Sequence, residues 1–254
     1  PFHGMFGRLP GMADDVLVPW SWLAHTRERM FRNDEPLPPE LREHFVAAYD
    51  ESLRYLDDQL GRLLAGLERR GRFEDSLIVI TSDHGELFGE HDLVEHSCDP
   101  YEGLTHVPLV VRHPGEGRGA RVAETVETRA IFEMALAAAG LAPPARDGLT
   151  PVSETYLDPR SAAWTARFER SRRAVYSEGW KLIASSDGRH ELYDLNADPR
   201  ETTDLYDAEP ERRGRLEALL AAWLASEATL PLRVEPDDVG EETVEWMRAL
   251  GYVR

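Results

Sequence analysis

A long amphipathic stretch is the clearest periodic pattern in the chain. From Glu40 to Arg70, apolar side chains recur at spacings of three and four residues, which places them on one face of an α-helix. They are Leu41, Phe45, Tyr49, Leu53, Leu56, Leu60, Leu63 and Leu67. Two prolines precede the stretch, and Gly71 follows it as a helix-ending residue. The pattern therefore predicts a scaffold helix over 40–70.

A short unbroken apolar run follows this helix and ends in polar residues. Residues 77–80 read Leu-Ile-Val-Ile, and residues 81–84 read Thr-Ser-Asp-His. The run predicts a strand over 77–82 that is buried on both faces, as in a parallel sheet. Ligands of such sheets bind just beyond the carboxyl ends of the strands. Asp83 and His84 therefore lie where an α/β protein carries out its chemistry.

Weaker patterns predict the remaining elements. Apolar runs predict five more strands, at 107–111, 122–126, 174–178, 180–184 and 191–195. Gly179 and the Asp-Gly pair at 187–188 separate the last three, which is a β-hairpin signature. Helices are expected at 130–139, 212–225 and 241–250. Residues 1–39 are punctuated by Gly and Pro, and 145–172 follow no clear pattern.

Composition narrows the class of protein. The 254 residues are 42% hydrophobic and 30% charged, which is typical of a soluble globular protein with a sizeable core. No run is long enough to span a membrane, and no signal peptide opens the chain. A cytoplasmic location is slightly favoured on this basis, although the chain starts at Pro1 without an initiator Met, so an amino-terminal signal region is not visible.

Charge and cysteine content exclude some kinds of site. The formal charge of −18 argues against nucleic acid or an anionic membrane as partner. The single cysteine, Cys98, rules out an internal disulfide and a metal site built from several cysteines.

The Asp83–His84 pair suits a divalent cation. A carboxylate oxygen beside an imidazole nitrogen offers two donors that are readily deprotonated near neutral pH. The loop that follows, 83–106, is rich in His, Asp and Glu, and loops of this length inside compact domains tend to be functional. The dipeptide alone leaves another interpretation open, in which Ser82 and Asp83 cap a helix and His84 is a surface residue.

An ordered series of motifs resembles the sulfatase family of the alkaline phosphatase superfamily. The motifs are Thr-Ser-Asp-His-Gly-Glu at 81–86, Gly-Glu-His at 89–91, Tyr-Glu at 101–102 and His-Val-Pro-Leu at 106–109. Three more resemble the small carboxy-terminal sheet of sulfatases: Trp-Lys-Leu-Ile at 180–183, Glu-Leu-Tyr-Asp-Leu at 191–195 and Asp-Pro-Arg-Glu-Thr at 198–202. The match covers most of residues 45–205.

The resemblance implies the fold class and its division. We expect an α/β fold, comprising part of an alkaline-phosphatase-like mixed or parallel sheet flanked by helices, plus a small carboxy-terminal antiparallel sheet with a helix. Residues 1–145 would form the carboxy-terminal part of the catalytic domain. Residues 146–254 would form a small subdomain with a structural role, in which Lys181 is a possible contact at the rim of the site.

The resemblance also implies an activity. A sulfatase-like hydrolase cleaves a small-molecule or saccharide sulfate ester with one divalent cation, Ca²⁺ in first place and Mg²⁺ or Mn²⁺ as alternatives. Asp83 and His84 would be half of its metal shell. The formylglycine nucleophile is expected outside this sequence. Two alternatives stay open: a phosphotransferase or a phosphonate or phosphate ester hydrolase of the same superfamily, and a truncated chain without catalysis that only binds a partner.

Three further histidines are candidate site residues by the same resemblance. His96 lies five residues after His91, where many sulfatases place a lysine that contacts the substrate oxyanion. A protonated imidazole can donate to an oxyanion, so His96 is a candidate for catalysis and substrate binding. His91 is expected to bind substrate or to orient ligands from behind the metal. His3 lies where sulfatases supply a histidine to the ester, although a loop histidine without function explains it equally well.

Cys98 is expected to be an ordinary thiol. Sulfatases convert a cysteine in a Cys-x-Pro-Ser-Arg or Cys-x-Pro-Ala-Arg motif to formylglycine. Cys98 has the proline at position 100 but lacks the small residue and the arginine. It also follows the metal strand, whereas the nucleophile of the family precedes it.

Overall fold

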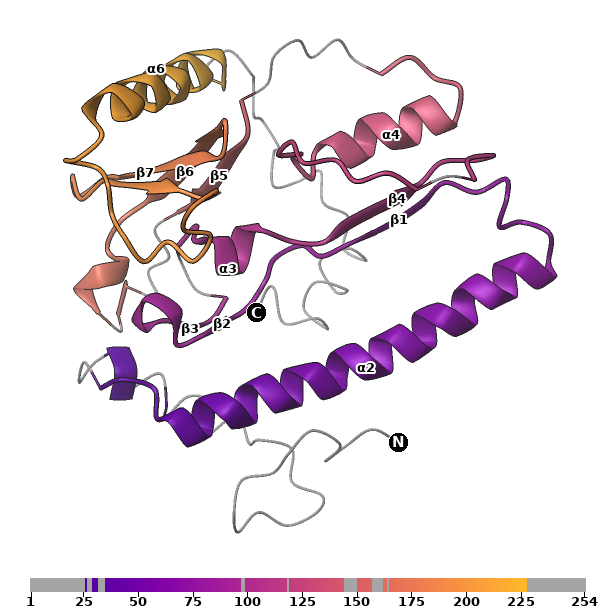
Figure 1. Cartoon of the computed structure of the whole chain (residues 1–254), viewed down its shortest axis with the longest axis horizontal. Helices are drawn as coiled ribbons and strands as arrows, with labels where there is room; N and C mark the ends of the chain where they lie inside the picture. Colours follow the sequence, from indigo (N-terminus) through magenta and orange to yellow (C-terminus); the bar gives the residue numbers. More distant parts are fainter. Residues whose placement is uncertain are drawn as a thin grey trace, which may run out of the picture.

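The computed structural model describes residues 26, 29–31, 35–96, 99–117, 119–143, 150–156, 162–163 and 165–227. Its longest element is helix α2, Pro39–Arg69, which runs along one side of the molecule below strands β1 and β4 in Figure 1. A proline begins the helix, Glu40 lies in its first turn and Arg69 in its last, as the helix dipole favours. The helix predicted over 40–70 is confirmed.

The strand that precedes Asp83 differs from its prediction. Strand β1, Ile78–Thr81, is half-buried and pairs antiparallel with β4, Leu109–Arg112, in a register that sets Ile78 opposite Arg112. Within the described residues β4 is its only partner. The expectation of a strand buried on both faces in a parallel sheet is therefore wrong for this part of the chain. An apolar run specifies a strand but not the direction of its neighbour, and here the chain turns back before β4.

The segment between β1 and β4 is a compact excursion. It contains the short strands β2, Leu87–Phe88, and β3, Val94–Glu95, joined by a 3₁₀ turn at Glu90–Asp92, and then the one-turn helix α3, Glu102–Thr105. Gly85 fixes its position, because its amide donates to the Leu104 carbonyl at 2.8 Å and a Cβ there would lie 2.1 Å from the Gly103 oxygen. Only glycine allows this close approach.

Beyond β4 one prediction is confirmed and one is wrong. Helix α4 covers Ala130–Ala138, as expected. No strand lies between β4 and α4 in the described residues, so the strand predicted at 122–126 is wrong. Val122 is 70% exposed and Val126 is 42% exposed. Within the part of the chain that the structure describes, neither valine belongs to a sheet.

The carboxy-terminal sheet has four antiparallel strands in the order β5-β6-β7-β8. The strands are Val152–Thr155, Arg172–Ser177, Trp180–Ser185 and Glu191–Asp194, and a 3₁₀ turn covers Ala166–Phe168. The last three strands confirm the hairpin prediction. Glu178 and Gly179 join β6 to β7 with positive φ angles of 52° and 77°, as the tight turns of hairpins require. Strand β5 lies where the sequence pattern was unclear.

Helix α6, Pro210–Glu227, lies across one face of this sheet (Figure 1). Its Leu216 and Leu220 pack on an apolar layer formed by Val175, Leu182 and Leu192. The helix predicted at 212–225 is confirmed, whereas the one predicted at 241–250 lies outside the described residues. None of the described helices is long and apolar enough to cross a membrane.

The other face of the sheet shares a core with the excursion after β1. Leu87, Leu93 and Leu104 belong to the same buried cluster as Ala174 and Ile183. This packing sets the loop that carries the candidate site residues against the carboxy-terminal sheet. The division of the chain at residue 145 stays a prediction.

Candidate functional site

Asp83 and His84 lie together just beyond the carboxyl end of β1. The Nε2 atom of His84 is 3.7 Å from Oδ2 of Asp83, and both side chains reach solvent. The Nδ1 atom of His84 is 2.8 Å from the Gly85 carbonyl oxygen. A carbonyl oxygen can only accept, so Nδ1 carries the proton. In the neutral ring, the lone pair is then on Nε2, the atom that faces the carboxylate.

The electrostatics keep the Asp83 carboxylate ionised. Desolvation acts to raise its pKa, but the His84 ring, the His84 backbone N–H at 3.0 Å and the Ser82 hydroxyl together lower the pKa below its ordinary value. The carboxylate is therefore charged at neutral pH and can serve as a cation ligand.

The separation of these two donors is compatible with shared binding of one cation. Two atoms 3.7 Å apart can both lie within the roughly 2.0–2.6 Å at which His nitrogen and carboxylate oxygen bind divalent cations. Among the described residues, no group of three or more His, Cys, Asp or Glu side chains is arranged to hold a metal ion. The spacing of the pair is compatible with binding to one cation, and its assignment as half of a metal shell stays a prediction.

His96 is brought next to His84 by the β2–β3 hairpin. The two imidazole rings stack with centroids 4.5 Å apart. Leu87 pairs with Glu95, so the next pair of the ladder sets Glu86 opposite His96, and the Glu86 Oε2 atom is 3.5 Å from Nδ1 of His96. Sequence reasoning did not nominate Glu86 as a site residue. The signal that could have found it is Gly89, which allows the chain to fold back between residues 86 and 96.

His91 lies in a different environment from His96. Its ring stacks on Tyr101 with centroids 3.7 Å apart and planes 4° apart, and its carbonyl accepts a 2.8 Å hydrogen bond from Arg167. It lines a hollow of about 840 Å³ against the carboxy-terminal sheet, whereas His96 lines a neighbouring hollow of about 390 Å³ against α2; Glu86 and Leu87 line both. The structure therefore brings His96, but not His91, to the Asp83–His84 pair. The role of each in substrate binding stays a prediction.

Acid is expected to destabilise the protein through His91. Burial lowers the pKa of His91, Glu191 opposes this, and Arg167 and Lys181 add to it. Because the folded pKa lies below the unfolded value of about 6.5, the stability contributed by the neutral ring is complete above that value and is lost as the pH falls through the folded pKa.

The measurement is the free energy of unfolding in urea at pH 7.5, 6.5 and 5.5 for the wild type and His91→Phe. Phenylalanine keeps a ring against Tyr101 but cannot be protonated. The wild type should lose more stability than the variant on acidification. Parallel pH profiles would contradict the assignment.

Two sequence-predicted residues cannot be placed. His3 and Cys98 lie outside the described residues, so the roles suggested for them stay predictions.

Lys181 corrects another expectation, because it is not at the rim of the site. Its side chain is fully buried, and its Nζ atom lies 2.7 Å from Glu201 Oε1 and 3.0 Å from Glu102 Oε1. Desolvation opposes its charge, but Tyr176, Glu201 and Glu102 raise its pKa above the ordinary value. The lysine therefore stays charged as an internal link between α3 and the sheet. Glu102, from the Tyr-Glu motif at 101–102, and Glu201 provide this link.

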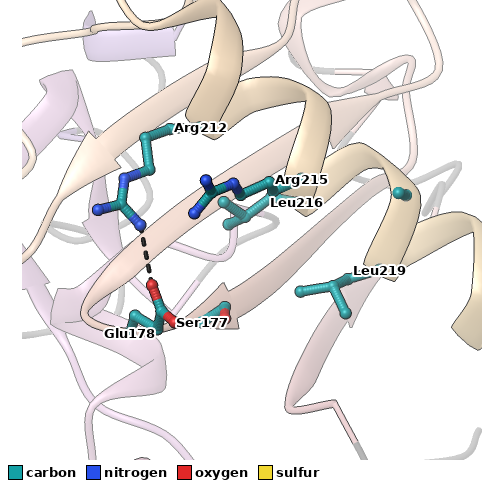
Figure 2. Close-up of a pocket in the computed structure, with 7 residues that line it drawn as sticks. Ser177, Glu178, Arg212, Arg215, Leu216 and Leu219 are labelled. Atoms are coloured by element: carbon teal, nitrogen blue, oxygen red, sulfur yellow. Dashed lines mark hydrogen bonds and ion pairs between the residues drawn. The ribbon is translucent and has the colours of Figure 1, made fainter.

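A further hollow, of about 420 Å³, lies between α6 and the β6–β7 turn. Figure 2 shows Arg212 and Arg215 above it, with Arg212 bonded to Glu178 at 2.9 Å. Leu216 and Leu219 line its helix side. It contains none of the predicted site residues, so the candidate site is the group formed by Asp83, His84, Glu86 and His96.

Comparison with known proteins relates part of the chain to a known family. The family model described as Sulfatase matches residues 21–141, which include all four residues of the candidate site. The arylsulfatase of Clostridium perfringens (strain 13 / Type A) is 29% identical over 176 residues, which are 64% of this chain and 36% of that protein.

Solved structures share the fold. The phosphonate monoester hydrolase of Agrobacterium radiobacter matches with a TM-score of 0.64 and 24% identity, over 75% of this chain and 43% of that one. A protein solved in complex with its substrate D-glucosamine-2-N,6-O-disulfate matches with a TM-score of 0.63 and 21% identity, over 84% of this chain and 48% of that one. The expected fold class, an alkaline-phosphatase-like α/β fold with a small antiparallel sheet, is confirmed.

The matches cover only part of the other proteins. The chain spans about a third of the length of the curated relatives that it matches. It spans less than half of each of the two solved structures.

Proposed function

We propose that the complete protein is a member of the sulfatase family and hydrolyses sulfate esters with the help of a divalent cation, because the Sulfatase model matches residues 21–141 and an arylsulfatase is 29% identical. The observation that carries the proposal is the Asp83–His84 pair, whose charged carboxylate and free Nε2 lone pair face each other across 3.7 Å beyond β1. Family resemblance favours Ca²⁺, with Mg²⁺ and Mn²⁺ as alternatives.

The residues of this chain have distinct tasks in the proposal. Asp83 and His84 hold the cation, and the hydrogen bond from His84 Nδ1 to Gly85 fixes the ring that does so. When bound, the cation neutralises the non-bridging oxygens of the sulfate and activates the nucleophile. His96, held by Glu86 and by stacking on His84, donates to the sulfate in place of a lysine. His91 packs behind this loop and keeps it in place.

The nucleophile is proposed to lie in a segment that is not part of this sequence. Family resemblance points to a formylglycine. Cys98 lacks the motif for that conversion, so it is not assigned this role.

The substrate is proposed to be a small-molecule or saccharide sulfate ester. The sulfatase relative and the disulfated glucosamine bound by a protein of the same fold support sulfate. A phosphonate or phosphate ester is the second candidate. The absence of a lysine at position 96 and the likeness to a phosphonate monoester hydrolase favour it.

The test measures cation binding and turnover in the full-length protein. Asp83→Ala should weaken Ca²⁺ binding at least tenfold, because a hard cation loses a charged oxygen ligand. Hydrolysis of an aryl sulfate should fall with it. The matched control is Asp57→Ala on α2, since Asp57 is exposed to a similar extent, 73% against 78% for Asp83.

The control should leave binding and turnover unchanged. Unchanged Ca²⁺ affinity in Asp83→Ala would remove this residue from the metal shell. Faster hydrolysis of an aryl phosphonate than of the aryl sulfate would favour the second candidate.

A further inference from the structure

The hollow between the start of α6 and the β6–β7 turn, here called the α6 hollow, shares no lining residue with the candidate site (Figure 2). Its volume of about 420 Å³ falls within the range of sites that hold small-molecule ligands. Its helix side is cationic and apolar, and its turn side is polar. The lining includes Arg212, Arg215, Leu216 and Leu219 of the helix and Ser177 and Glu178 of the turn.

The turn side of the α6 hollow is fixed by its packing on the end of β8. The Leu195 backbone N–H donates to the Gly179 carbonyl at 2.8 Å, and the Asn196 side-chain amide donates to the Glu178 carbonyl at 3.4 Å. A Cβ at Gly179 would lie 2.1 Å from Asn196 Nδ2, so the two segments are in direct contact. The Glu178 carboxylate is therefore presented to the hollow from a well-supported backbone.

Arg212 is held in place at the mouth of the hollow. Its Nη1 atom donates to Glu178 Oε2 at 2.9 Å, and its guanidinium carbon lies 5.5 Å from the centre of the Trp180 ring. The side chain is still 36% exposed, and a guanidinium has five N–H donors. Arg212 therefore keeps donors available to a ligand while its own position is set by protein contacts.

Arg215 supplies a cation that the protein does not neutralise. It lies three residues after Arg212, on the same face of α6, and Figure 2 shows the two guanidinium groups beside each other. Arg215 forms no ion pair or hydrogen bond with any residue that the structure describes. By contrast, Arg213, which does not line the hollow, lies 3.9 Å from both Asp207 and Glu217. The hollow thus has two guanidinium groups and one carboxylate.

These two arginines do not stabilise the helix that carries them. They lie in the first two turns of α6, where the helix dipole disfavours cations, and the last turn has no basic residue. Like charges three residues apart also repel each other. An anion between the two guanidinium groups would remove this repulsion. The arrangement is therefore costly for the free protein and favourable for an anionic complex.

The charge and walls of the α6 hollow restrict the kind of anion. One uncompensated cation matches a ligand with a single negative charge, and the fork of a guanidinium matches the two oxygens of a carboxylate. A phosphate monoester, with a charge of about −1.5 to −2 at neutral pH, would bring excess negative charge towards Glu178. Leu219 is half-buried beside Arg215 and offers an apolar surface to an aliphatic chain.

We propose that the α6 hollow binds a small aliphatic carboxylic acid, with its carboxylate between Arg212 and Arg215 and its chain on Leu219. This site is separate from the proposed sulfate ester hydrolysis and does not depend on it.

The test is calorimetric titration of the full-length protein with hexanoate. Arg215→Ala should weaken binding roughly tenfold, because a charge-assisted hydrogen bond is lost, and Leu219→Ala should weaken hexanoate more than acetate, which has no chain. Hexanamide has the same chain without the charge and should bind at least tenfold more weakly than hexanoate. The matched control is Arg213→Ala, which removes an arginine of the same helix that does not line the hollow and should leave binding unchanged.

Asp83→Ala separates this site from the candidate site and should leave hexanoate binding unchanged. Binding that is lost in Asp83→Ala and kept in Arg215→Ala would place the ligand at the candidate site and overturn the proposal. Equal affinities for hexanoate and hexanamide would reject an anion site. Tighter binding of hexyl phosphate than of hexanoate in the Asp83→Ala protein would overturn the assignment to a carboxylate.

Discussion

Lys181→Met is expected to lower the free energy of unfolding by about 3–5 kcal/mol, the usual cost of breaking a buried ion pair by removing one partner. The methionine fills most of the space of the lysine. It leaves Glu201, whose side chain is 1% exposed, without the cation that lies 2.7 Å from it. Glu102, 15% exposed, loses the same partner. Both carboxylates then lose the buried cation that compensates for their desolvation.

Neighbouring contacts fix the groups that surround the lysine. Glu201 Oε2 accepts the backbone N–H of Glu102 at 2.6 Å, so its carboxylate is fixed at the start of α3. The ammonium also lies 5.2 Å from the centre of the Tyr176 ring, a cation–π contact that closes the site on the sheet side. The charge of Lys181 thus holds α3 against β7.

Urea unfolding of the single and double variants measures this effect. In Lys181→Met/Glu201→Gln the unpaired charge at 201 is gone, so the double variant should be more stable than Lys181→Met alone. The control is Arg62→Met, which breaks the exposed pair with Asp58 on α2 and should cost about 1 kcal/mol or less. A loss below 1 kcal/mol for Lys181→Met would show that the link is not structural.

The elements that the sequence predicts well are those specified by local pattern. Helix α2 carries its own period of apolar residues, and the β6–β7 hairpin carries its own turn at Glu178 and Gly179. In both cases the residues that decide the structure are neighbours in the chain. Their boundaries agree with the prediction within about two residues.

The features that the sequence predicts badly depend on distant segments. The direction of the partner of β1 is decided by the path of the chain through the excursion from 82 to 108. The burial of Lys181 depends on Glu102, which is 79 positions away. The residues next to a lysine in the sequence do not indicate that its side chain is buried, because lysines are usually exposed. Glu86 is an intermediate case, since its contact with His96 follows from the hairpin register once the turn at Gly89 is recognised.

Arg172→Met is the second variant with a large expected effect, about 3–5 kcal/mol of lost stability. The guanidinium is completely buried and bridges two segments, because Nη1 donates to Asp99 at 2.7 Å and Nη2 donates to Glu191 of β8. Asp99 and Glu191 raise the pKa of Arg172 despite its desolvation, so the cation is permanent. Its removal leaves Asp99, 1% exposed, with weaker contacts to Arg170 at 3.3 Å and Arg167 at 3.8 Å.

Arg172→Lys provides the decisive comparison. A lysine keeps the charge but presents one ammonium, which cannot donate to Asp99 and Glu191 in the forked geometry of a guanidinium. Its stability should therefore lie between those of the wild type and Arg172→Met. If the charge alone mattered, Arg172→Lys would have the same free energy of unfolding as the wild type. If the site tolerated loss of the cation, the free energy of unfolding of Arg172→Met would differ from that of the wild type by less than about 1 kcal/mol. Urea unfolding of the three proteins at pH 7.5 distinguishes these outcomes. An intermediate free energy of unfolding for Arg172→Lys would support the forked bridge from Asp99 to Glu191 of β8 as a contact that holds the loop on the sheet.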